Sequence, residues 1–565
     1  MPKPIPQRGP QSTMPSVHEA LALHQHGRLN EAERIYSRIL KLRPDDFDAL
    51  HLLGMLKHQQ GKAGEAYRLI VAALAVNPES ADALSNLGLV LQRLKREAEA
   101  LASFDKALAI APTHIEALNN RGSSLLTSGY PDDAFIHFNK ALVLQPGHLE
   151  ARINRANALC ALARWEEALT DYHAVLTAAP SHSGAWFNLG NALRSMGRDV
   201  EALSAFDRCL SITPDNTKAL NNRGMVLQAL NRHHEASLQF EQATTVNKDY
   251  ADAHFNDALS LLTLGEFRRG LKKYEWRGKR TGMPPPRSFR QPLWLGEYPL
   301  QRKTILVHAE QGLGDSIQFA RYAKLLAGAG ARVFLEVPAS LKDLFLQVEG
   351  VTGVVGTGEQ LPSFDVHCPL ASLPLAFHTD LTTIPISIPY LQAPKLQTDK
   401  WRTRLERIAS PRIALAWAGN PNHPNDRNRS IALARLDPLL AALPGHFISI
   451  QRGVPNADIP QLDRVLRHGS LVDHLGEELA DFCDTAAILT LVDLVISVDT
   501  SVAHLAGAMG RPVWIPLPFS PDWRWMLGRE DSPWYPTARL FRQPSPSDWE
   551  SVIGHLRDEL KQVLD

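Results

Sequence analysis

The chain has 565 residues, and its 60 lysines and arginines balance its 60 aspartates and glutamates. Net charge therefore gives no support to a polyanionic partner such as nucleic acid, while the length allows several domains. The four cysteines are scattered without a CxxC pair, which argues against a disulfide framework or a zinc site and fits a reducing compartment.

The N-terminus and the distribution of apolar residues indicate a cytoplasmic protein. The opening MPKPIPQRGPQSTMP lacks the apolar core of a signal peptide, and no later stretch approaches eighteen uninterrupted apolar residues. We expect residues 1–12 to be disordered and no transmembrane segment to follow.

The first half of the chain repeats with a period of 34 residues. Prolines mark the period at Pro44, Pro78, Pro112, Pro146, Pro180 and Pro214. Ten residues after each proline stands a small residue: Gly54, Gly88, Gly122, Ala156, Gly190 and Gly224. A large apolar residue follows sixteen positions later, at Ile70, Phe104, Phe138, Tyr172, Phe206 and Phe240. Small residues let two helices approach closely, the large side chain fills the gap between them, and proline ends the second helix.

This pattern is that of tetratricopeptide repeats. It predicts about eight helix pairs over residues 13–280, which stack into an all-α superhelix. Such a superhelix presents a concave surface to a protein partner.

An asparagine recurs with the same period, two positions before the small residue of the first helix: Asn86, Asn120, Asn154, Asn188, Asn222 and Asn256. In tetratricopeptide repeats this position lines the concave surface, where a column of amides can grip the backbone of an extended peptide. The alternative is that asparagine is merely tolerated on this face or bonds locally to the neighbouring turn. The column resembles the asparagine ladder of the O-linked N-acetylglucosamine transferases, and that resemblance implies a protein acceptor.

A basic, proline-rich linker at residues 281–296 ends the repeats, because its three consecutive prolines favour an extended conformation. Beyond it, apolar strand patterns alternate with helical patterns, which is typical of α/β folds with parallel sheets. We expect two Rossmann-like lobes facing a cleft. Their ranges are 297–395 for the N-terminal lobe, 396–409 for a crossover, 410–545 for the C-terminal donor-binding lobe, and 546–565 for a final helix.

Polar residues follow three of the predicted strands, at the ends where α/β folds gather their ligands. In the turn HAEQGLGD, Gly312 and Gly314 admit a ligand close to the backbone, and Asp315 is either a general base or a helix cap. The loop after Trp417 is either solvated surface or a clamp whose guanidinium forks match a diphosphate. Its candidate residues are Asn420, Arg427 and Arg429.

The third strand end lies in VISVDTSVAHLAGAMGRPVW. Asp499, Thr500 and Ser501 stand between a strand and a helix, where free backbone N–H groups, the helix dipole and two hydroxyls attract phosphate. His504 lies one turn further on and faces the same crevice in this interpretation. An ordinary capping turn with a packed histidine is the alternative.

Together, GLGD, the arginine-bearing strand end and DTSVAHLAGAMGRP resemble glycosyltransferase family 9, the heptosyltransferase-like enzymes of the two-lobed GT-B fold, over about residues 300–545. By that resemblance Asp315 matches the catalytic aspartate, and the residues from Asp499 to His504 match the donor-binding signature. Ser501 stands where many members have glycine. Arg427 or Arg429 replaces the lysine usual in heptosyltransferases, which leaves the identity of the donor open.

These resemblances imply an inverting, metal-independent glycosyltransferase without a cofactor. The expected donor is a nucleotide sugar, and the expected acceptor is a hydroxyl of a polypeptide held by the repeats, such as flagellin or another surface protein. Two other classes stay open: a lipopolysaccharide or glycolipid glycosyltransferase, and a non-catalytic repeat scaffold with a nucleotide-binding domain. Homodimer formation and the role of the tryptophan-rich segment 514–536 are also left open.

Overall fold

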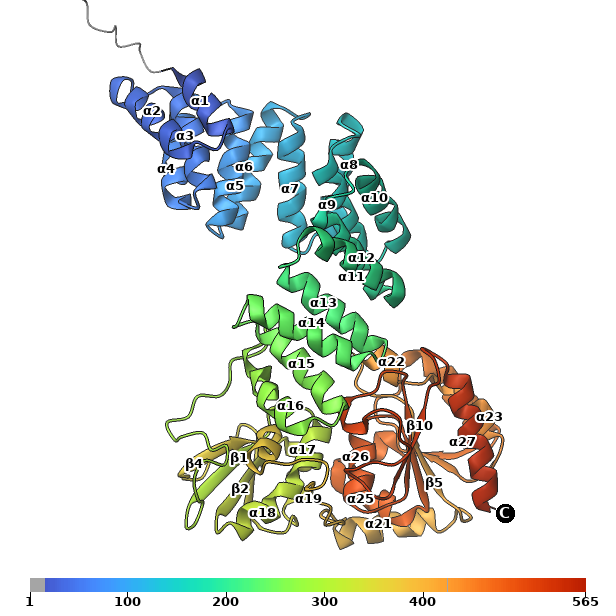
Figure 1. Ribbon diagram of the computed structural model, residues 1–565. Helices are drawn as coiled ribbons and strands as arrows, with labels where there is room; N and C mark the ends of the chain where they lie inside the picture. The colour runs from blue at the N-terminus through green and yellow to red at the C-terminus, as the bar shows by residue number, and fades with distance from the viewer. Residues whose placement is uncertain (1–15, 424, 565) are drawn as a thin grey trace, which may run out of the picture. The chain divides into compact units, whose positions relative to one another are not determined.

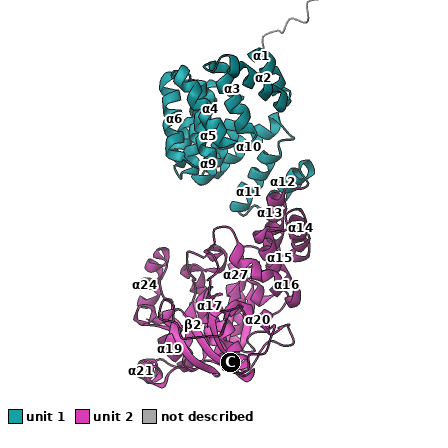
Figure 2. Ribbon diagram, turned by 90° about the vertical axis from the view of Figure 1, so that its left-hand side faces the viewer, with its two compact units in different colours: residues 1–214 teal, residues 215–565 magenta. Residues whose placement is uncertain are grey.

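The computed structural model of the protein describes residues 16–423 and 425–564 (Figure 1). The chain divides into two compact units, residues 1–214 and 215–565, which Figure 2 shows in different colours. The segment 1–12, predicted to be disordered, lies outside the described residues.

The described part of unit 1 is all-helical, and its helices pack in chain order, α1 with α2, α3 with α4 and so on. Their bounds are α1 (Val17–Gln25), α2 (Leu29–Leu42), α3 (Phe47–Gln59), α4 (Ala63–Val76), α5 (Ala81–Arg93), α6 (Glu97–Ile110), α7 (Ile115–Thr127), α8 (Pro131–Leu144), α9 (Leu149–Ala161), α10 (Trp165–Ala178), α11 (Ser183–Ser195) and α12 (Asp199–Ile212).

Packing within each pair explains the 34-residue period. Phe104 of α6 is fully buried, and a Cβ placed on Gly88 of α5 would lie only 2.3 Å from its ring. The small residue is required because the aromatic ring fills the space between the two helices. Several of the first helices in a pair begin with a side chain that accepts a hydrogen bond from a backbone N–H in the first turn. These caps are Asp46, Ser80, His114, His148 and His182.

Unit 2 begins with helices of the same repeat pattern and continues into an α/β region. The repeat helices are α13 (Thr217–Ala229), α14 (His233–Val246), α15 (Ala251–Thr263) and α16 (Phe267–Tyr274), followed by the 3-10 helix η1 (Glu275–Lys279).

Among the described residues, the α/β region opens with a four-stranded parallel sheet in the order β3-β2-β1-β4. Its elements are β1 (Thr304–His308), α17 (Leu313–Phe319), α18 (Ala323–Gly328), β2 (Arg332–Val337), α19 (Ala339–Phe345), β3 (Val351–Gly356), β4 (Val366–Pro369) and α20 (Leu373–Ala376).

A six-stranded parallel sheet follows in the described chain, in the order β10-β9-β8-β5-β6-β7. Its elements are α21 (Lys395–Leu405), β5 (Ile413–Ala416), α22 (Asp426–Arg429), α23 (Asp437–Leu440), β6 (Phe447–Ser449), α24 (Ile459–Arg467), β7 (Leu471–His474), α25 (Phe482–Leu491), β8 (Leu494–Ser497), α26 (Ser501–Ala508), β9 (Val513–Leu517), η7 (Trp523–Trp525), β10 (Ala538–Arg542) and α27 (Trp549–Leu564).

Each sheet contains a point where the order of its strands reverses. In the first sheet the chain runs outward from β1 through β2 and β3, then returns to the other side of β1 as β4. In the second it runs from β5 through β6 and β7, then returns beside β5 as β8. Doubly wound α/β sheets bind ligands at this switch point, beyond the carboxyl ends of the strands. Helices α17 and α26, which begin just after β1 and β8, pack against each other, so the loops leaving these two strands meet.

The last repeat helix is part of the α/β core. Phe267 of α16 stacks on Trp534 with ring centroids 5.9 Å apart and meets the edge of Trp523 at 6.0 Å. Tyr274, at the end of α16, also packs against Trp523, with centroids 6.2 Å apart. All four rings are buried. The prolines of the predicted linker break the helical pattern but not the packing, and the compact unit begins at residue 215 rather than after the linker.

We expect a fragment of residues 215–565 to fold and a fragment of residues 281–565 to aggregate. The shorter fragment lacks Phe267 and Tyr274 and would expose Trp523 and Trp534, and each buried aromatic side chain contributes about 1.5–3 kcal/mol. Soluble yield and tryptophan fluorescence during thermal unfolding measure the difference. Equal yield and equal melting of the two fragments would contradict the assignment of α13–α16 to the α/β core.

Candidate functional site

The three strand ends with candidate residues lie at the switch-point edges of the sheets. The turn with Asp315 leaves β1, the loop with Arg429 leaves β5, and the turn with Asp499 leaves β8. Strands β5 and β8 are neighbours, and the Arg429 guanidinium donates through Nη1 to the backbone oxygen of Asp499 over 3.0 Å. Parallel pairing therefore joins two sets of residues that are about seventy positions apart in sequence.

Asp315 lies in α17, which follows β1 of the four-stranded sheet. Its Oδ2 accepts a hydrogen bond from the backbone N–H of Gly312 over 2.9 Å, which is the capping role considered from the sequence. Its Oδ1 accepts from the guanidinium of Arg524. The side chain of Asp315 is 22% exposed. Asp315 is thus both a cap of α17 and a partly accessible carboxylate in contact with a loop of the other sheet.

Arg524 is the functional candidate that sequence reasoning missed. It lies in η7, in the loop that leaves β9, and β9 pairs with β8. Besides Asp315, its guanidinium donates to Gln318 Oε1 at 2.5 Å and to Asp522 Oδ1 at 2.8 Å. The side chain is only 8% exposed. One feature of the sequence could have indicated it, because this loop also follows a strand and carries Asp522 and Arg524 among tryptophans.

His504 is buried where α17 and α26 meet. Its Nδ1 is 2.9 Å from the hydroxyl of Tyr535, and its ring stacks on Trp525 with centroids 5.3 Å apart. A Cβ on Gly314 would lie 2.8 Å from its Cδ2, so the glycine permits this close approach of the two helices. Burial, and secondarily the charge of Arg524, lower the pKa of His504 to about 3, which keeps the imidazole neutral at physiological pH.

Asp499 is a second carboxyl group near these residues. Its Oδ1 lies 3.9 Å from Nε2 of His504. Burial raises the pKa of Asp499 to about 6, and the negative charge of Asp522 adds to this effect, while Arg429 and Arg524 oppose it. The folded protein therefore holds the proton of this carboxyl group more tightly than the unfolded chain does.

The remaining predicted donor-site residues surround these groups. Thr500 caps α26, and its hydroxyl lies 3.2 Å from that of Ser497. Ser501 is the first residue of α26 and is half-buried. Asn420 and Arg427 are exposed in the loop after β5. Arg429 thus bonds to the backbone of Asp499, and Arg524 bonds to Asp315. The charges of both arginines act on Asp499, so these groups lie near one another.

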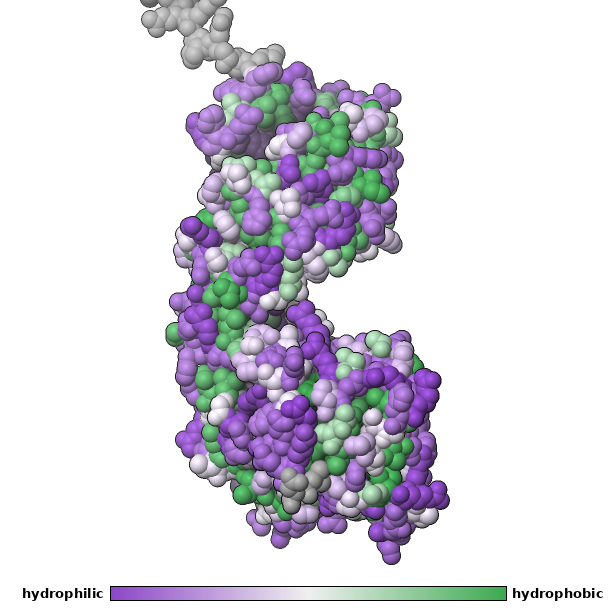
Figure 3. Space-filling model, turned by 90° about the vertical axis from the view of Figure 1, so that its right-hand side faces the viewer, coloured by the Kyte–Doolittle hydropathy of each residue, from purple (hydrophilic) through white to green (hydrophobic). Residues whose placement is uncertain are grey.

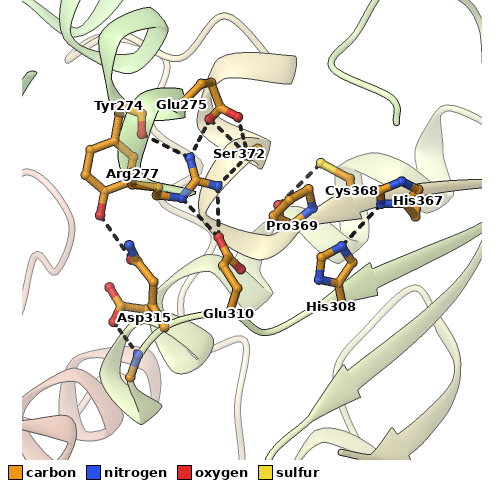
Figure 4. Close-up of polar contacts among 12 residues, drawn as sticks. Tyr274, Glu275, Arg277, His308, Glu310, Asp315, His367, Cys368, Pro369 and Ser372 are labelled. Atoms are coloured by element: carbon orange, nitrogen blue, oxygen red, sulfur yellow. Dashed lines mark hydrogen bonds and ion pairs between the residues drawn. The ribbon is translucent and has the colours of Figure 1, made fainter. Parts of the chain in front are cut away.

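Residues from the end of the repeats occupy the other switch point, between β1 and β4 (Figure 4). Arg277 of η1 donates to Glu310 Oε1, after β1, at 2.8 Å and to the hydroxyl of Ser372, after β4, at 2.6 Å. The Tyr274 hydroxyl donates to Gln311 at 3.0 Å. Burial raises the pKa of Glu310, against the opposing charge of Arg277. These contacts tie the last repeat to the turn that carries GLGD.

The asparagine column bonds from one repeat to the preceding one. The pairs are Asn86 with His51 (2.9 Å), Asn120 with Ser85 (3.4 Å), Asn154 with Asn119 (3.0 Å) and Asn256 with Asn221 (2.9 Å). Asn188 and Asn222 are half-buried, and the side-chain oxygen of Asn222 accepts a hydrogen bond from Asn221 at 3.2 Å. Local bonding was the alternative to peptide binding, and it is present here between repeats rather than to a neighbouring turn. Each bond employs one N–H of the asparagine amide, which also carries a second N–H and a carbonyl oxygen.

Over residues 16–423 and 425–564, no group of three or more histidine, cysteine, aspartate or glutamate side chains is arranged to hold a metal ion. No helix in the same described ranges has the length and apolarity needed to cross a membrane. On the face shown in Figure 3, hydrophilic and hydrophobic side chains are interspersed.

Comparison with known proteins identifies the class of the N-terminal half. Residues 18–67, 79–145, 153–217 and 217–250 match tetratricopeptide repeat families. The predicted repeats are therefore confirmed, and the protein combines tetratricopeptide repeats with a C-terminal α/β region.

One curated relative is the protein FlbA of Caulobacter vibrioides, which is 26% identical over 337 residues. The match covers 54% of this chain and 54% of the relative, so it spans about half the length of each protein.

Several solved structures are similar to parts of this chain at low identity. A tetratricopeptide repeat protein from Parabacteroides merdae is 19% identical with a TM-score of 0.37, over 43% of this chain and 97% of its own. YrrB, described as a TPR protein with an unusual peptide-binding site, is 23% identical with a TM-score of 0.27, over 33% and 95%. The type IV pilus biogenesis factor PilW is 23% identical with a TM-score of 0.35, over 37% and 96%.

The raised pKa of Asp499 predicts a pH-dependent effect of Asp499→Asn on stability. Because the folded protein holds this proton more tightly than the unfolded chain, the wild type loses stability as the pH rises from about 4 to about 6. The free energy of unfolding of Asp499→Asn, relative to wild type, should rise over that range by at most about 3 kcal/mol and then stay constant. Urea unfolding at a series of pH values measures it.

Asp531→Asn is the control with the opposite sign. Asp531 is paired with Arg529, whose hydrogen bond lowers the pKa of this exposed carboxyl group. Its replacement should therefore lower relative stability as the pH rises. A difference between Asp499→Asn and wild type that does not change with pH would contradict the raised pKa.

Proposed function

We propose that the protein is an inverting, metal-independent glycosyltransferase of the GT-B type, which transfers a sugar from a nucleotide sugar to a hydroxyl of a protein acceptor. The main support is the convergence of Asp315 from one sheet with Asp499 and Arg429 from the other. Each group follows the carboxyl end of a parallel strand at a switch point, where α/β folds bind nucleotides. The resemblance of GLGD and DTSVAH to glycosyltransferase family 9 indicates that the reaction at these residues is glycosyl transfer.

In the proposed reaction, Asp315 takes the proton of the acceptor hydroxyl as that oxygen attacks the anomeric carbon. The new carbon–oxygen bond forms while the bond from the anomeric carbon to the diphosphate breaks. The nucleoside diphosphate leaves with the electron pair, and Asp315 ends the step as a carboxylic acid. No oxidant, reductant or metal ion is needed for this balance.

The leaving diphosphate needs fixed positive groups to stabilise its developing charge. Arg429 and Arg427 lie on the loop after β5, and the first turn of α26 offers backbone N–H groups near Thr500 and Ser501. The guanidinium fork matches two phosphate oxygens at once. We assign the nucleotide diphosphate to the loop after β5 and the first turn of α26, with Asn420 at the edge of this site.

Acceptor binding is assigned to the asparagine column. Asn120 and Asn154 each donate one N–H to the preceding repeat, which leaves the other N–H and the carbonyl oxygen of each amide for a peptide backbone. Backbone recognition of this kind tolerates many side-chain sequences. The acceptor is therefore proposed as an extended polypeptide segment, with flagellin or another surface protein as the working candidate.

One observation favours a second candidate, a non-catalytic scaffold. The Gly312 N–H and the Arg524 guanidinium already bond the two oxygens of Asp315. In a scaffold this arrangement would be permanent, and nucleotide binding would occur without sugar transfer. A glycolipid transferase is distinguished differently, because its label would enter the lipid fraction instead of protein.

Nucleotide binding is the first test of the proposal. Calorimetry of the full chain against a panel of nucleoside diphosphates and nucleotide sugars should identify one nucleotide. Arg429→Ala should weaken its binding about tenfold to a hundredfold, because a charge-assisted hydrogen bond contributes about 1.5–3 kcal/mol. Arg427→Ala together with Arg429→Ala should abolish it.

Arg435→Ala is the matched control, because Arg435 is exposed on the same lobe, beyond the loop that carries Arg429. Arg429→Lys tests whether charge alone is sufficient, since lysine cannot reproduce the fork. Absence of binding by any nucleotide, with acceptor lysate present, would refute the donor assignment. Binding that is unaffected by Arg429→Ala would place the nucleotide elsewhere.

Asp315→Asn should lower the rate of sugar transfer by roughly a hundredfold or more, because the amide cannot accept the acceptor proton. Nucleotide affinity should not fall below that of wild type, since asparagine keeps an oxygen for the Gly312 N–H and preserves the cap. Incorporation of labelled sugar into lysate protein measures the rate. Equal rates for Asp315→Asn and wild type would exclude Asp315 as the base.

A further inference from the structure

The proposed base is not free in this structure. Its Oδ2 accepts from the backbone N–H of Gly312, and its Oδ1 accepts from the guanidinium of Arg524. A general base must present an oxygen within hydrogen-bond reach of the proton that it removes. The cap on Oδ2 belongs to the fold of α17, and Arg524 occupies one of the acceptor positions of Oδ1, so its departure opens the space in front of Oδ1 for the acceptor hydroxyl.

Arg524 is a single positive charge shared between two carboxylates. It donates through Nη1 to Asp522, on its own loop, and through Nη2 to Asp315, on the other sheet. Its guanidinium carbon lies 4.6 Å from the ring centre of Trp523 and 5.7 Å from that of Phe319. Aromatic faces and Asp522 can hold the cation when the bond to Asp315 is broken, so Asp315 is the exchangeable partner.

The backbone of this loop is held at several points, so a change of partner requires only the side chain to move. Asn231, in the turn after α13, donates to the backbone oxygen of Phe519 at 2.6 Å. The Ser520 hydroxyl donates to the backbone oxygen of Gln228 at 3.1 Å. Trp525, next to Arg524 in sequence, stacks on His504 of α26. The guanidinium therefore lies close to the helix whose first turn is assigned to the diphosphate.

We propose that Arg524 is a positioning residue that responds to the donor: it binds the diphosphate of the nucleotide sugar and, in doing so, releases Oδ1 of Asp315. This inference rests on the proposed function. A diphosphate offers the same paired oxygens as a carboxylate, with more negative charge, and therefore competes for the guanidinium fork. The base becomes available only after the donor is bound, so the acceptor is activated second.

The experiment follows the accessibility of Asp315 itself rather than turnover. A water-soluble carbodiimide with an amine nucleophile labels accessible carboxyl groups, and peptide mass spectrometry gives the labelling rate at Asp315. The probe is the nucleoside diphosphate that binds in calorimetry, without its sugar, so that the space in front of Asp315 stays open. The full-length wild type is compared with Arg524→Gln and Arg524→Lys. Arg268→Gln is the control, because the side chain of Arg268 is 80% exposed on the surface.

The wild type should label slowly at Asp315 without nucleotide and about fivefold to tenfold faster with saturating nucleotide, as should Arg268→Gln. Arg524→Gln should label fast in both conditions and bind the nucleotide about tenfold to a hundredfold more weakly. Arg524→Lys should keep part of the nucleotide response. The comparison of wild type with and without nucleotide tests the inference even if the Arg524 variants fail to fold.

Three outcomes overturn the inference in distinguishable ways. If no nucleoside diphosphate binds the wild type, the proposed function fails and this inference fails with it. If a nucleotide binds while the labelling rate of Asp315 is unchanged, the donor assignment stands and the release of Asp315 is refuted. If folded Arg524→Gln binds the nucleotide as tightly as wild type, Arg524 does not bind the diphosphate.

Discussion

One buried guanidinium holds together carboxylates that come from two different sheets. Removing a charged group from water is costly unless partners compensate for it, and Arg524 meets this condition with Asp315, Asp522 and the amide oxygen of Gln318. Asp499 lies near this guanidinium, and burial raises its pKa, with the negative charge of Asp522 adding to the effect. The contact between the loops of the two sheets therefore depends on these charges as well as on apolar packing.

Parallel strands impose the second constraint. All their carboxyl ends lie on one edge, so the loops after β5, β8 and β9 gather side by side although they are distant in sequence. The same rule gathers the loops after β1 and β4 in the other sheet, where Arg277 joins Glu310 to Ser372. The switch point between β1 and β4 is thus filled by residues of the chain itself. The switch point between β5 and β8 carries the candidate residues for diphosphate binding. This asymmetry is expected if the two sheets have different tasks.

Sequence patterns predicted the elements well because both patterns are local. The 34-residue period reflects contacts such as Phe104 against Gly88, sixteen positions apart, and the strand ends carry Asp315, Arg429 and Asp499 as expected. Arg524 was missed because its partner Asp315 is 209 positions away and no local pattern links them. The packing of Phe267 against Trp523 and Trp534 could not be predicted for the same reason, because both tryptophans are far from Phe267 in the sequence.

The division of the repeats between the two compact units bears on how such proteins diversify. Repeats up to Pro214 form their own compact unit, whereas α13–α16 brace the loop that carries Arg524 and share the aromatic core of the α/β region. We therefore expect gain, loss or exchange of repeats to be tolerated better before residue 214 than after it. An array grafted at that junction would present a new partner surface while the aromatic frame around the tryptophans stays intact. Lineages carrying this architecture should accordingly vary in the number of early repeats and keep the last two.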